Sequence, residues 1–210
     1  IDMRGGKDSD FFFASEETNE GIVERLVKYC TENLPRYYHA DPLRDIQVLT
    51  PMQRGTVGAA NLNQVLQEAM NPQGPALRRG GVCYRIRDKV MQIRNDYDKE
   101  VFNGDIGTIR RVDLEDREIT VDFDGREVAY DVTAIHKAQG SEYPIVVMPF
   151  SMSHFVMLQR NLLYTGVTRA KKILVLIGEK KAVFYAVRNG RMAERNTRLA
   201  ERILLADTSI

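Results

Sequence analysis

The sequence of 210 residues contains no tryptophan, two cysteines and three histidines. Two isolated cysteines, Cys30 and Cys83, exclude a disulfide framework, and no spacing of cysteine and histidine suits a metal site, so we expect no metal ligands. No apolar run approaches the ~20 residues that span a bilayer, and no signal peptide opens the chain. The formal net charge of +1 does not favour any particular class of binding partner. We therefore expect a cytoplasmic protein without membrane contact.

The chain also lacks a Gly-x-x-x-x-Gly-Lys-Ser/Thr phosphate loop. No acidic pair follows a strand, as a magnesium site beside a nucleotide would require. The first residue is Ile1 and not a methionine. We therefore expect a fragment of a longer protein.

Hydrophobic residues make up 43% of the chain and charged residues 28%, which is typical of a folded domain. Its first part alternates buried strands with amphipathic helices, a pattern that favours an α/β fold. The expected elements are an edge strand at 11–13, a helix from Ser15 to Pro35, a strand at 46–49 and a helix at 57–70.

The same alternation returns near the C-terminus. The expected elements are a strand at 144–148, a helix with Phe155 and Val167 on its buried side, a strand at 173–177 and a final helix that buries Val183, Val187 and Met192. Both parts together predict one parallel sheet with helices on both faces, built from residues 1–73 and 132–210.

The segment between these two parts has a different texture. Apolar and polar residues alternate strictly at 119–123, and the dipeptides Asn103-Gly104 and Asp124-Gly125 favour tight hairpin turns. Short strands joined by such turns predict a small antiparallel β-barrel at 74–131, inserted into the α/β domain.

Two polar segments carry residue types suited to a nucleotide or a nucleic acid. Residues 135–144 (Ile-His-Lys-Ala-Gln-Gly-Ser-Glu-Tyr-Pro) combine several hydrogen-bond donors with a glycine just before a strand. Residues 161–172 end in Thr-Arg-Ala-Lys-Lys, where Arg169 follows a turn-like Gly-Val-Thr context. The plainer alternative for residues 135–144 is a polar loop that caps a strand. In the second segment the helix dipole accounts for Lys171 and Lys172 but less well for Arg169, whose guanidinium group can reach a γ-phosphate.

The order and wording of these segments resemble motifs V and VI of superfamily-1 helicases, specifically the RecD/TraA type (exodeoxyribonuclease V alpha-chain-like). Residues 48–55 (Val-Leu-Thr-Pro-Met-Gln-Arg-Gly) are similar to motif IV of that group, and residues 90–107 are similar to its inserted barrel. The resemblance covers about residues 40 to 205. It implies a RecA-like, P-loop-NTPase-type second motor domain with an inserted Src-homology-three-like barrel.

The resemblance also implies site residues. Arg169 and Arg54 are implied as catalytic groups that face the γ-phosphate, with Gly140, Glu142 and Gln53 as nucleotide contacts. The residues implied to contact single-stranded DNA are His136, Lys137 and Thr133. ATP and Mg²⁺ are implied to be held mainly by a preceding RecA-like domain of the same parent protein.

The barrel residues are less sharply assigned. Arg94 and Asn95, together with Lys89, Arg110 and Arg111, can line a DNA path, but a solvated barrel face explains them as well. The departures from the family are few. Ala134 stands where the family has threonine, with Thr133 one step earlier, and the join after Asp131 is so short that we expect residues to be missing there.

The function implied by the resemblance is ATP-dependent DNA unwinding with 5′-to-3′ translocation, in DNA repair and recombination, with nuclease-complex subunits as possible partners. This chain alone is expected to be inactive. Two alternatives remain at this point: a docking or DNA-holding module that keeps the motor fold without ATP turnover, and the helicase part of a conjugative relaxase.

Overall fold

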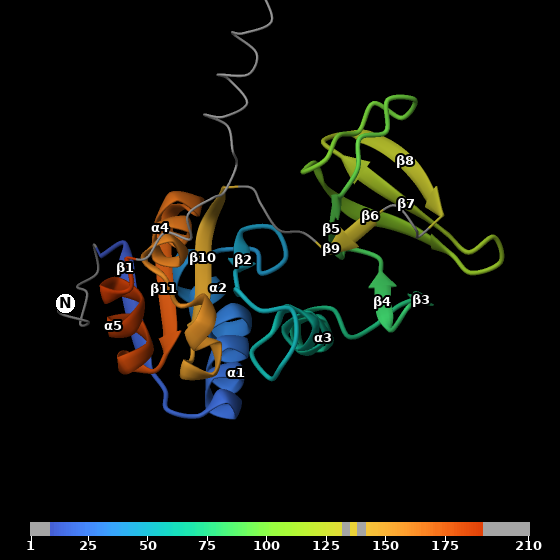
Figure 1. Ribbon diagram of the computed structural model, residues 1–210. Coiled ribbons are helices and arrows are strands. Elements are labelled where there is room, and N and C mark those ends of the chain that lie inside the picture. Colours follow the sequence, from blue (N-terminus) through green and yellow to red (C-terminus); the bar gives the residue numbers. More distant parts are fainter. Residues whose placement is uncertain (1–8, 132–134, 138–141, 191–210) are drawn as a thin grey trace, which may run out of the picture.

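The computed structural model describes residues 9–131, 135–137 and 142–190, and it divides into an α/β part and a separate antiparallel part (Figure 1). The expected final helix from Met192 onward lies outside the described residues, as do Thr133 and Gly140. No described helix is both long and apolar enough to cross a membrane.

The α/β part is built on four parallel strands in the order β1-β11-β10-β2. Their bounds are Phe11–Ser15 for β1, Ile46–Val48 for β2, Tyr143–Phe150 for β10 and Ala170–Gly178 for β11. Among the described strands, β1 pairs with β11 alone, which confirms the expected edge strand. The two strands predicted from long apolar runs, β10 and β11, lie in the centre of the sheet.

Helices cover both faces of this sheet. One face carries α1 (Asn19–Lys28), α2 (Leu34–Tyr38) and α3 (Ala59–Met70), and the other carries α4 (Arg160–Arg169) and α5 (Lys180–Arg188). Successive strand residues point to opposite faces, so Val147 of β10 joins the first core and Val146 joins the second. Two cores on one parallel sheet confirm the expected fold class.

The antiparallel part, which we call the barrel domain, consists of a five-stranded sheet and a two-stranded hairpin. The sheet order is β8-β7-β6-β5-β9, and the hairpin joins β3 to β4. The bounds are Ala76–Arg79 for β3, Val82–Arg85 for β4, Lys89–Gln92 for β5, Ile106–Asp113 for β6, Glu118–Phe123 for β7, Arg126–Asp131 for β8 and Ile135–Lys137 for β9. Its own core is closed by residues such as Val90, Ile109 and Tyr130.

The turn predictions had mixed outcomes. Asp124 and Gly125 take φ angles of 51° and 92° and join β7 to β8, as the hairpin prediction requires. Asn103 and Gly104 also form a tight turn, with Gly104 at a φ angle of 102° and the amide of Asp105 bonded to the carbonyl of Phe102, but this turn lies within the long connection between β5 and β6. Strand β9 lies beyond the expected barrel boundary at residue 131 but pairs with β5, so the barrel sheet takes a strand from the neighbouring segment.

The predicted start and end of the first helix were wrong. Ser15 ends β1, and the helix begins after Thr18, whose hydroxyl accepts a hydrogen bond from the amide of Gly21. Pro35 does not end the helix, because a π-helical segment, Tyr29–Asn33, leads directly into α2 with the proline in its first turn. Leu34 donates its amide to the carbonyl of Tyr29 across this junction, and Pro35 has no amide to donate, so the helix continues past the proline with one backbone hydrogen bond fewer.

The buried sides of the last helices also differ from the prediction. Phe155 belongs to a short 3₁₀ helix, Met152–Met157, and its side chain is exposed, as is that of Val167. On α5 the buried residues are Ala182 and Ala186, while Val187 is exposed. Small residues let α5 approach the sheet closely, a preference that hydrophobic periodicity alone does not register.

Candidate functional site

The open edge of the sheet at which β10 and β11 begin brings two predicted site residues together. Tyr143 and Ala170 are register partners, so Glu142 and Arg169, the residues before them, flank the same edge. Lys171 adds a second cation, because its Nζ lies 3.7 Å from Oε2 of Glu142. The Lys171 and Glu142 side chains are both more than half exposed. This edge, which we call the Arg169 edge, therefore exposes the Lys171–Glu142 pair to solvent, with the partly buried Arg169 next to it in sequence and register.

Helix α4 fixes the position of Arg169. The helix runs through Arg169 itself, so the turn-like context expected for residues 166–168 was wrong. Gly166 is buried against the sheet, where a Cβ atom would lie 2.3 Å from the sulfur of Met148. Close packing of α4 on β10 therefore fixes the position of the helix and of Arg169 at its C-terminal end. A cation at that end is favoured by the helix dipole.

Arg54 lies in a loop that is held in a defined shape. The carbonyls of Met52 and Gln53 accept hydrogen bonds from the first two amides of α3, and a Cβ atom at Gly58 would lie 2.3 Å from the carbonyl oxygen of Arg54. The side chains of Gln53 and Arg54 are exposed. The loop thus presents an amide and a guanidinium group at the N-terminus of a helix of 12 residues.

Arg54 and Arg169 are attached to different ends of the parallel strands. Arg169 precedes the N-terminal end of β11, whereas Arg54 lies six residues after β2, whose last residue, Val48, pairs with Val147 of β10. The expectation that both guanidinium groups face one γ-phosphate stays a prediction, as does the role of Gln53 beside Glu142 as a nucleotide contact.

The remaining motif V residues are only partly described. Gly140 and Thr133 lie outside the described residues. His136 and Lys137 belong to β9, where they are register partners of Met91 and Val90 of β5; their side-chain contacts are not among those described. Of the side chains that are described, no group of three or more histidines, cysteines, aspartates or glutamates is placed to hold a metal ion.

The predicted barrel residues take different roles. Arg94 is exposed. Asn95 is occupied within its own loop, where its Oδ1 accepts the amide of Asn103 at 2.9 Å and its Nδ2 donates to the hydroxyl of Tyr97 at 3.3 Å. Asn95 therefore stabilises the loop that follows β5, and Arg94 is the residue of this pair that remains available to a ligand.

Two aromatic residues in this loop were missed from the sequence. Tyr97 is 74% exposed and Phe102 is 45% exposed, and their rings meet edge to face with centroids 6.0 Å apart. Exposed aromatic rings beside an arginine are typical of surfaces on which the bases of single strands stack. The available signal was a pair of aromatic residues within an otherwise polar, turn-rich stretch.

The other barrel cations are engaged within the protein. Arg110 and Arg111 form ion pairs with Asp122 and Asp113 at 2.7 and 2.8 Å, and the hydrogen bond from Arg110 is the main reason that the pKa of Asp122 is lowered. Lys89 turns toward the α/β part, where its Nζ lies 4.6 Å from the ring centroid of Tyr143. These contacts favour the solvated-face alternative for Arg110 and Arg111, and they exclude Lys89 from an exposed DNA path.

A groove of about 890 Å³ runs between α3 and the β3–β4 hairpin. Its lining is mostly polar side chains and hairpin backbone, and includes Gln53, Asn61, Gln64, Arg78 and Gly80. Amide groups, an arginine and exposed backbone suit a polar, anionic chain better than an apolar ligand. Gln53 links this groove to the loop that carries Arg54.

Comparison with known proteins agrees with this architecture. A family model described as ATP-dependent RecD-like DNA helicase SH3 domain matches residues 62–123, and one described as UvrD-like helicase C-terminal domain matches residues 130–177. The first match includes part of α3 as well as most of the barrel domain. The second includes β9, the Arg169 edge and nearly all of β11.

Two curated relatives cover most of the chain. The ATP-dependent RecD2 DNA helicase of Deinococcus radiodurans is 39% identical over 170 residues, which are 75% of this chain and 23% of the relative. The RecBCD enzyme subunit RecD of Haemophilus influenzae is 33% identical over 147 residues, 68% of this chain and 23% of the relative. The chain thus spans about a quarter of the length of either relative.

Among solved structures, the Pif1 helicase from Bacteroides in complex with ADP-AlF3 and ssDNA matches 91% of this chain and 51% of its own, with a TM-score of 0.49 and 13% identity. The two family models and the two curated relatives agree on one family. The chain belongs to the RecD-type helicases and comprises their SH3-like domain and their C-terminal helicase domain.

Proposed function

We propose that this chain is the second motor domain, with its inserted barrel, of an ATP-dependent DNA helicase. The observation that carries the proposal is the Arg169 edge, where the partly buried Arg169 ends α4 beside the exposed pair of Lys171 and Glu142. A cluster of this kind suits the charge of a triphosphate held by another domain. The D. radiodurans relative is named an ATP-dependent helicase, which supports the same activity for the parent protein.

In this proposal the nucleotide is held mainly by a preceding RecA-like domain, because the chain has no phosphate loop. Mg²⁺ would be held there with ATP, where it neutralises phosphate charge. Arg169 reaches across to the γ-phosphate as an arginine finger, while Glu142 and Gly140 contact the nucleotide. ATP then closes the two domains because this bridge exists only while the γ-phosphate is attached, and hydrolysis lets them part.

Arg54 and Gln53 are better suited to the nucleic acid than to ATP. They lie in the exposed loop between β2 and α3, and Gln53 lines the groove beside the β3–β4 hairpin. An exposed guanidinium group beside a side-chain amide favours phosphate groups. We therefore place a DNA phosphate, and not the γ-phosphate, at Arg54.

Single-stranded DNA is proposed to contact both parts of the chain. In the barrel domain, Arg94 supplies charge and the Tyr97–Phe102 pair supplies a surface for stacking. In motif V the proposed contacts are His136, Lys137 and Thr133, as the family resemblance implies. Repeated closing and opening of the two motor domains would then move the strand, with the 5′-to-3′ polarity that the resemblance implies.

The cellular setting follows from the relatives. The H. influenzae relative is a subunit of the RecBCD enzyme, whereas the D. radiodurans relative carries the name of a helicase in its own right. We propose a role in DNA repair or recombination, in the cytoplasm where such DNA is processed, with nuclease-complex subunits as candidate partners.

Substitution of Arg169 by alanine in the full-length protein tests the finger role. We expect DNA-stimulated ATP turnover to fall by roughly 10³-fold or more, the lower end of the effect of arginine fingers in GTPases. Arg188→Ala is the matched control, because Arg188 also ends a helix on the same face of the sheet. Near-normal turnover of Arg169→Ala, with thermal unfolding unchanged, would remove Arg169 from the mechanism.

A further inference from the structure

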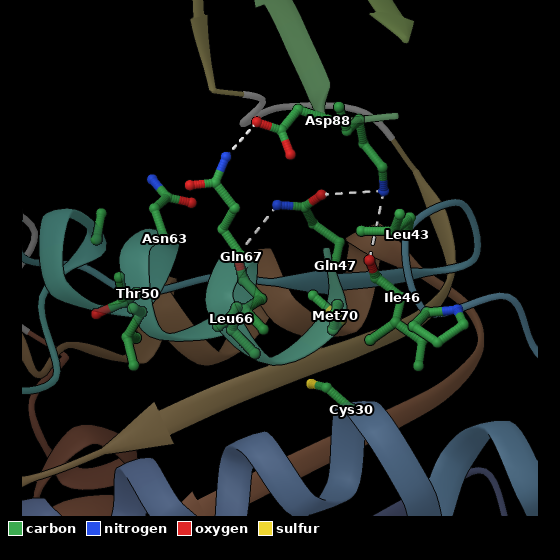
Figure 2. Close-up of a pocket in the computed structure, with 15 residues that line it drawn as sticks. Cys30, Leu43, Ile46, Gln47, Thr50, Asn63, Leu66, Gln67, Met70 and Asp88 are labelled. Carbon is green, nitrogen blue, oxygen red and sulfur yellow. Dashed lines mark hydrogen bonds between the residues drawn. The ribbon is translucent and has the colours of Figure 1, made fainter. Parts of the chain in front are cut away.

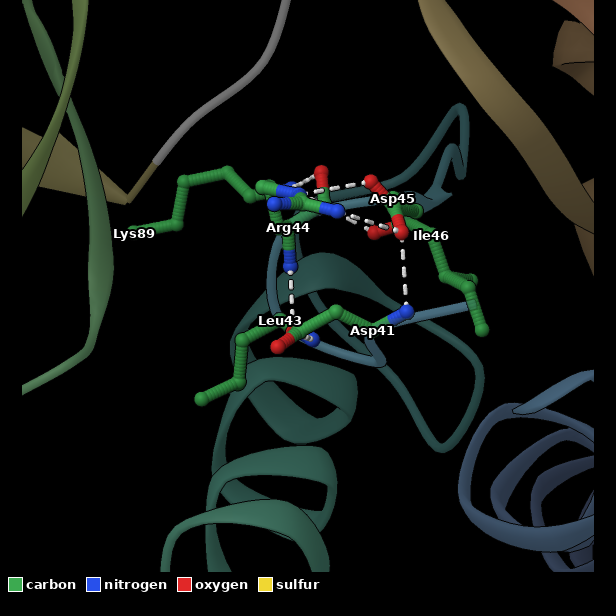
Figure 3. Close-up of polar contacts among 6 residues, drawn as sticks. All are labelled: Asp41, Leu43, Arg44, Asp45, Ile46 and Lys89. Carbon is green, nitrogen blue, oxygen red and sulfur yellow. Dashed lines mark hydrogen bonds and ion pairs between the residues drawn. The ribbon is translucent and has the colours of Figure 1, made fainter. Parts of the chain in front are cut away.

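Lys89 is a barrel residue whose side chain contacts the α/β part. It is the first residue of β5, and its Nζ lies 3.3 Å from the carbonyl oxygen of Arg44, 3.4 Å from that of Ile46 and 3.5 Å from Oε1 of Gln47. Figure 3 shows the side chain extending toward the turn that precedes β2. One ammonium group thus joins the barrel domain to the start of β2.

The same ammonium group also contacts β10. It lies over the ring of Tyr143 at 4.6 Å from the centroid, and that ring is buried. Tyr143 is the first residue of β10 and the register partner of Ala170, which directly follows Arg169. A continuous path of contacts therefore runs from β5 through Lys89 and Tyr143 to the Arg169 edge.

The pairing at the start of β10 is irregular on the β11 side. Pro144 has no amide to donate, and the register between β10 and β11 shifts between Tyr143 and Ile145. On the β2 side the ladder begins with the amide of Ile145, which donates to the carbonyl of Asp45 in the turn that Lys89 contacts. Lys89 and this turn therefore lie where the pairing of β10 with β2 begins.

The space beneath Lys89 leaves room for movement. A cavity of about 100 Å³ lies between β2, α3 and the start of β5, and Lys89, Gln67, Cys30 and Asp88 are among the residues that line it (Figure 2). Packed interiors transmit displacements in discrete steps, and a void beside a contact allows it to take a second arrangement. The joint between the barrel and the sheet is thus held by directional polar contacts over an incompletely filled core.

We propose that Lys89 is a positioning residue that couples the barrel domain to the Arg169 edge through Tyr143. The inference rests on the proposed function, in which DNA binds the barrel and ATP meets Arg169. When DNA shifts the barrel, β5 carries Lys89 with it, and the contact with Tyr143 moves the start of β10. Lys89 thereby makes ATP turnover responsive to DNA while touching neither.

Protonation gives this role a signature of its own. Burial lowers the pKa of Lys89 to about 8, although Asp45 and Asp41 act in the opposite direction. The other charged or titratable groups that face this site are Arg44 in the same turn, Tyr143 on β10, and Asp88 and Cys30 at the cavity. Asp45 has a lowered pKa, chiefly through its hydrogen bond from Arg44, and burial holds the pKa of Cys30 at about 12. Neither group changes charge near the pKa of Lys89.

Deprotonation of Lys89 has opposite effects on the stability of the fold and on the coupling. Between about 8 and 10.4 the unfolded chain binds the lysine proton and the folded chain does not, so this group adds stability as the pH rises. The contact of the ammonium group with the Tyr143 ring is lost over the same interval. A loss of coupling above about pH 8 is therefore not explained by unfolding.

The test compares Lys89→Met, Lys89→Arg and Lys99→Met in the full-length protein, with a thymidine oligonucleotide as the DNA. Lys99 is the matched control, because its Nζ lies 4.5 Å from the ring centroid of Tyr130 entirely within the barrel domain. We expect Lys89→Met to lower the ratio of DNA-stimulated to unstimulated ATP turnover by at least about fivefold. The unstimulated rate of Lys89→Met should stay within about twofold of the wild-type rate. Lys99→Met should keep the wild-type ratio. An unchanged ratio in Lys89→Met overturns the inference.

Two further readouts separate this inference from the proposed function. As the pH rises from about 7.5 to 9, the wild-type ratio should fall, whereas the ratio of Lys89→Arg, which stays protonated, should not. The same pH dependence in both proteins overturns the inference, even if Lys89→Met does not fold.

Hydrogen exchange at the starts of β10 and β11 needs no ATP turnover. We expect the oligonucleotide to slow it in the wild type and not in Lys89→Met, and absence of any response in the wild type overturns the coupling. A wild-type protein that responds in exchange but hydrolyses no ATP contradicts the proposed function alone.

Discussion

The two cysteines differ in burial and therefore in chemistry. Cys30 lies fully buried in the π-helical segment between α1 and α2, and burial raises the pKa of its thiol to about 12. Cys83 on β4 is only partly buried and lines the groove beside α3. Since the thiolate is the reactive form, the two residues report separately on the interior of the α/β part and on the groove.

We predict that iodoacetamide at about pH 8 alkylates Cys83 in the folded chain and leaves Cys30 unmodified. With a pKa of about 12, only about one Cys30 thiol in 10⁴ is ionised at that pH, and the side chain is also inaccessible. Peptide mass spectrometry measures the modification at each site. In denaturant both cysteines should react, which serves as the control. Equal labelling of both residues in the folded chain contradicts the packing around Cys30.

The residue types in the sequence predicted which side chains carry a functional group better than they predicted what each side chain contacts. Arg169 and Glu142 were identified from their motifs, and the structure places them at one edge. Lys89 stands in the same kind of polar stretch as Arg94, yet one is engaged with Tyr143 and the other is exposed. That difference depends on how the barrel domain meets the sheet, which local sequence does not encode.

At the scale of elements, the N-terminal cap of α1 lies at a different residue in the structure than the sequence predicted. Ser15 and Thr18 both carry hydroxyl groups ahead of a helical pattern, but Ser15 is paired within β1, whereas Thr18 directly precedes α1 and its hydroxyl accepts the Gly21 amide. We predict that Thr18→Ala lowers the free energy of unfolding by about 1 kcal/mol, whereas Ser15→Ala changes it by less than about 0.5 kcal/mol. Urea titration measures both values. A larger effect at Ser15 would place the helix start where the sequence first indicated it.

The separation of Arg54 from Arg169 was available from the predicted elements. Arg54 follows a strand and Arg169 precedes one, and in a parallel sheet those positions lie at opposite edges. The family resemblance implies that both arginines face one γ-phosphate, which stays a prediction, and strand direction adds that their segments join opposite ends of the strands. The edge to which a loop belongs is therefore predictable from order along the chain, while its side-chain contacts are not.

At the scale of the whole molecule, the fold class was predictable because periodicity reports burial directly. Runs of consecutive apolar residues became β10 and β11, buried on both faces, and the alternation at 119–123 became β7 in the barrel sheet. The joint between the two parts was not predictable. It consists of single polar residues on α3 and β5 that come together only when both parts are folded, and no periodicity accompanies them.

Asp88 is the centre of that joint. Its carboxylate is buried, with Oδ1 accepting from Nδ2 of Asn71 at 2.9 Å and Oδ2 accepting from the side-chain amide of Gln67 and from the backbone amide of Arg85. Gln67 and Asn71 come from α3 and its C-terminal cap, so one carboxylate ties the sheet's helix to the barrel domain. Each of its oxygens faces donors alone.

Asp88→Asn should therefore be costly, although it preserves shape. The new amide nitrogen turns a donor toward donors, whichever way the side chain is oriented, and leaves at least one buried amide without an acceptor. We predict a loss of about 2–3 kcal/mol in the free energy of unfolding by urea titration. Asp122→Asn is the control, because Asp122 pairs with Arg110, whose side chain is 57% exposed, and its effect should stay below about 1 kcal/mol. The loss at Asp88 should be accompanied by faster hydrogen exchange in β4 and β5 than in β7 and β8, since the joint opens before the barrel core does. Equal destabilisation by the two variants would mean that the barrel domain and the α/β part are held together elsewhere.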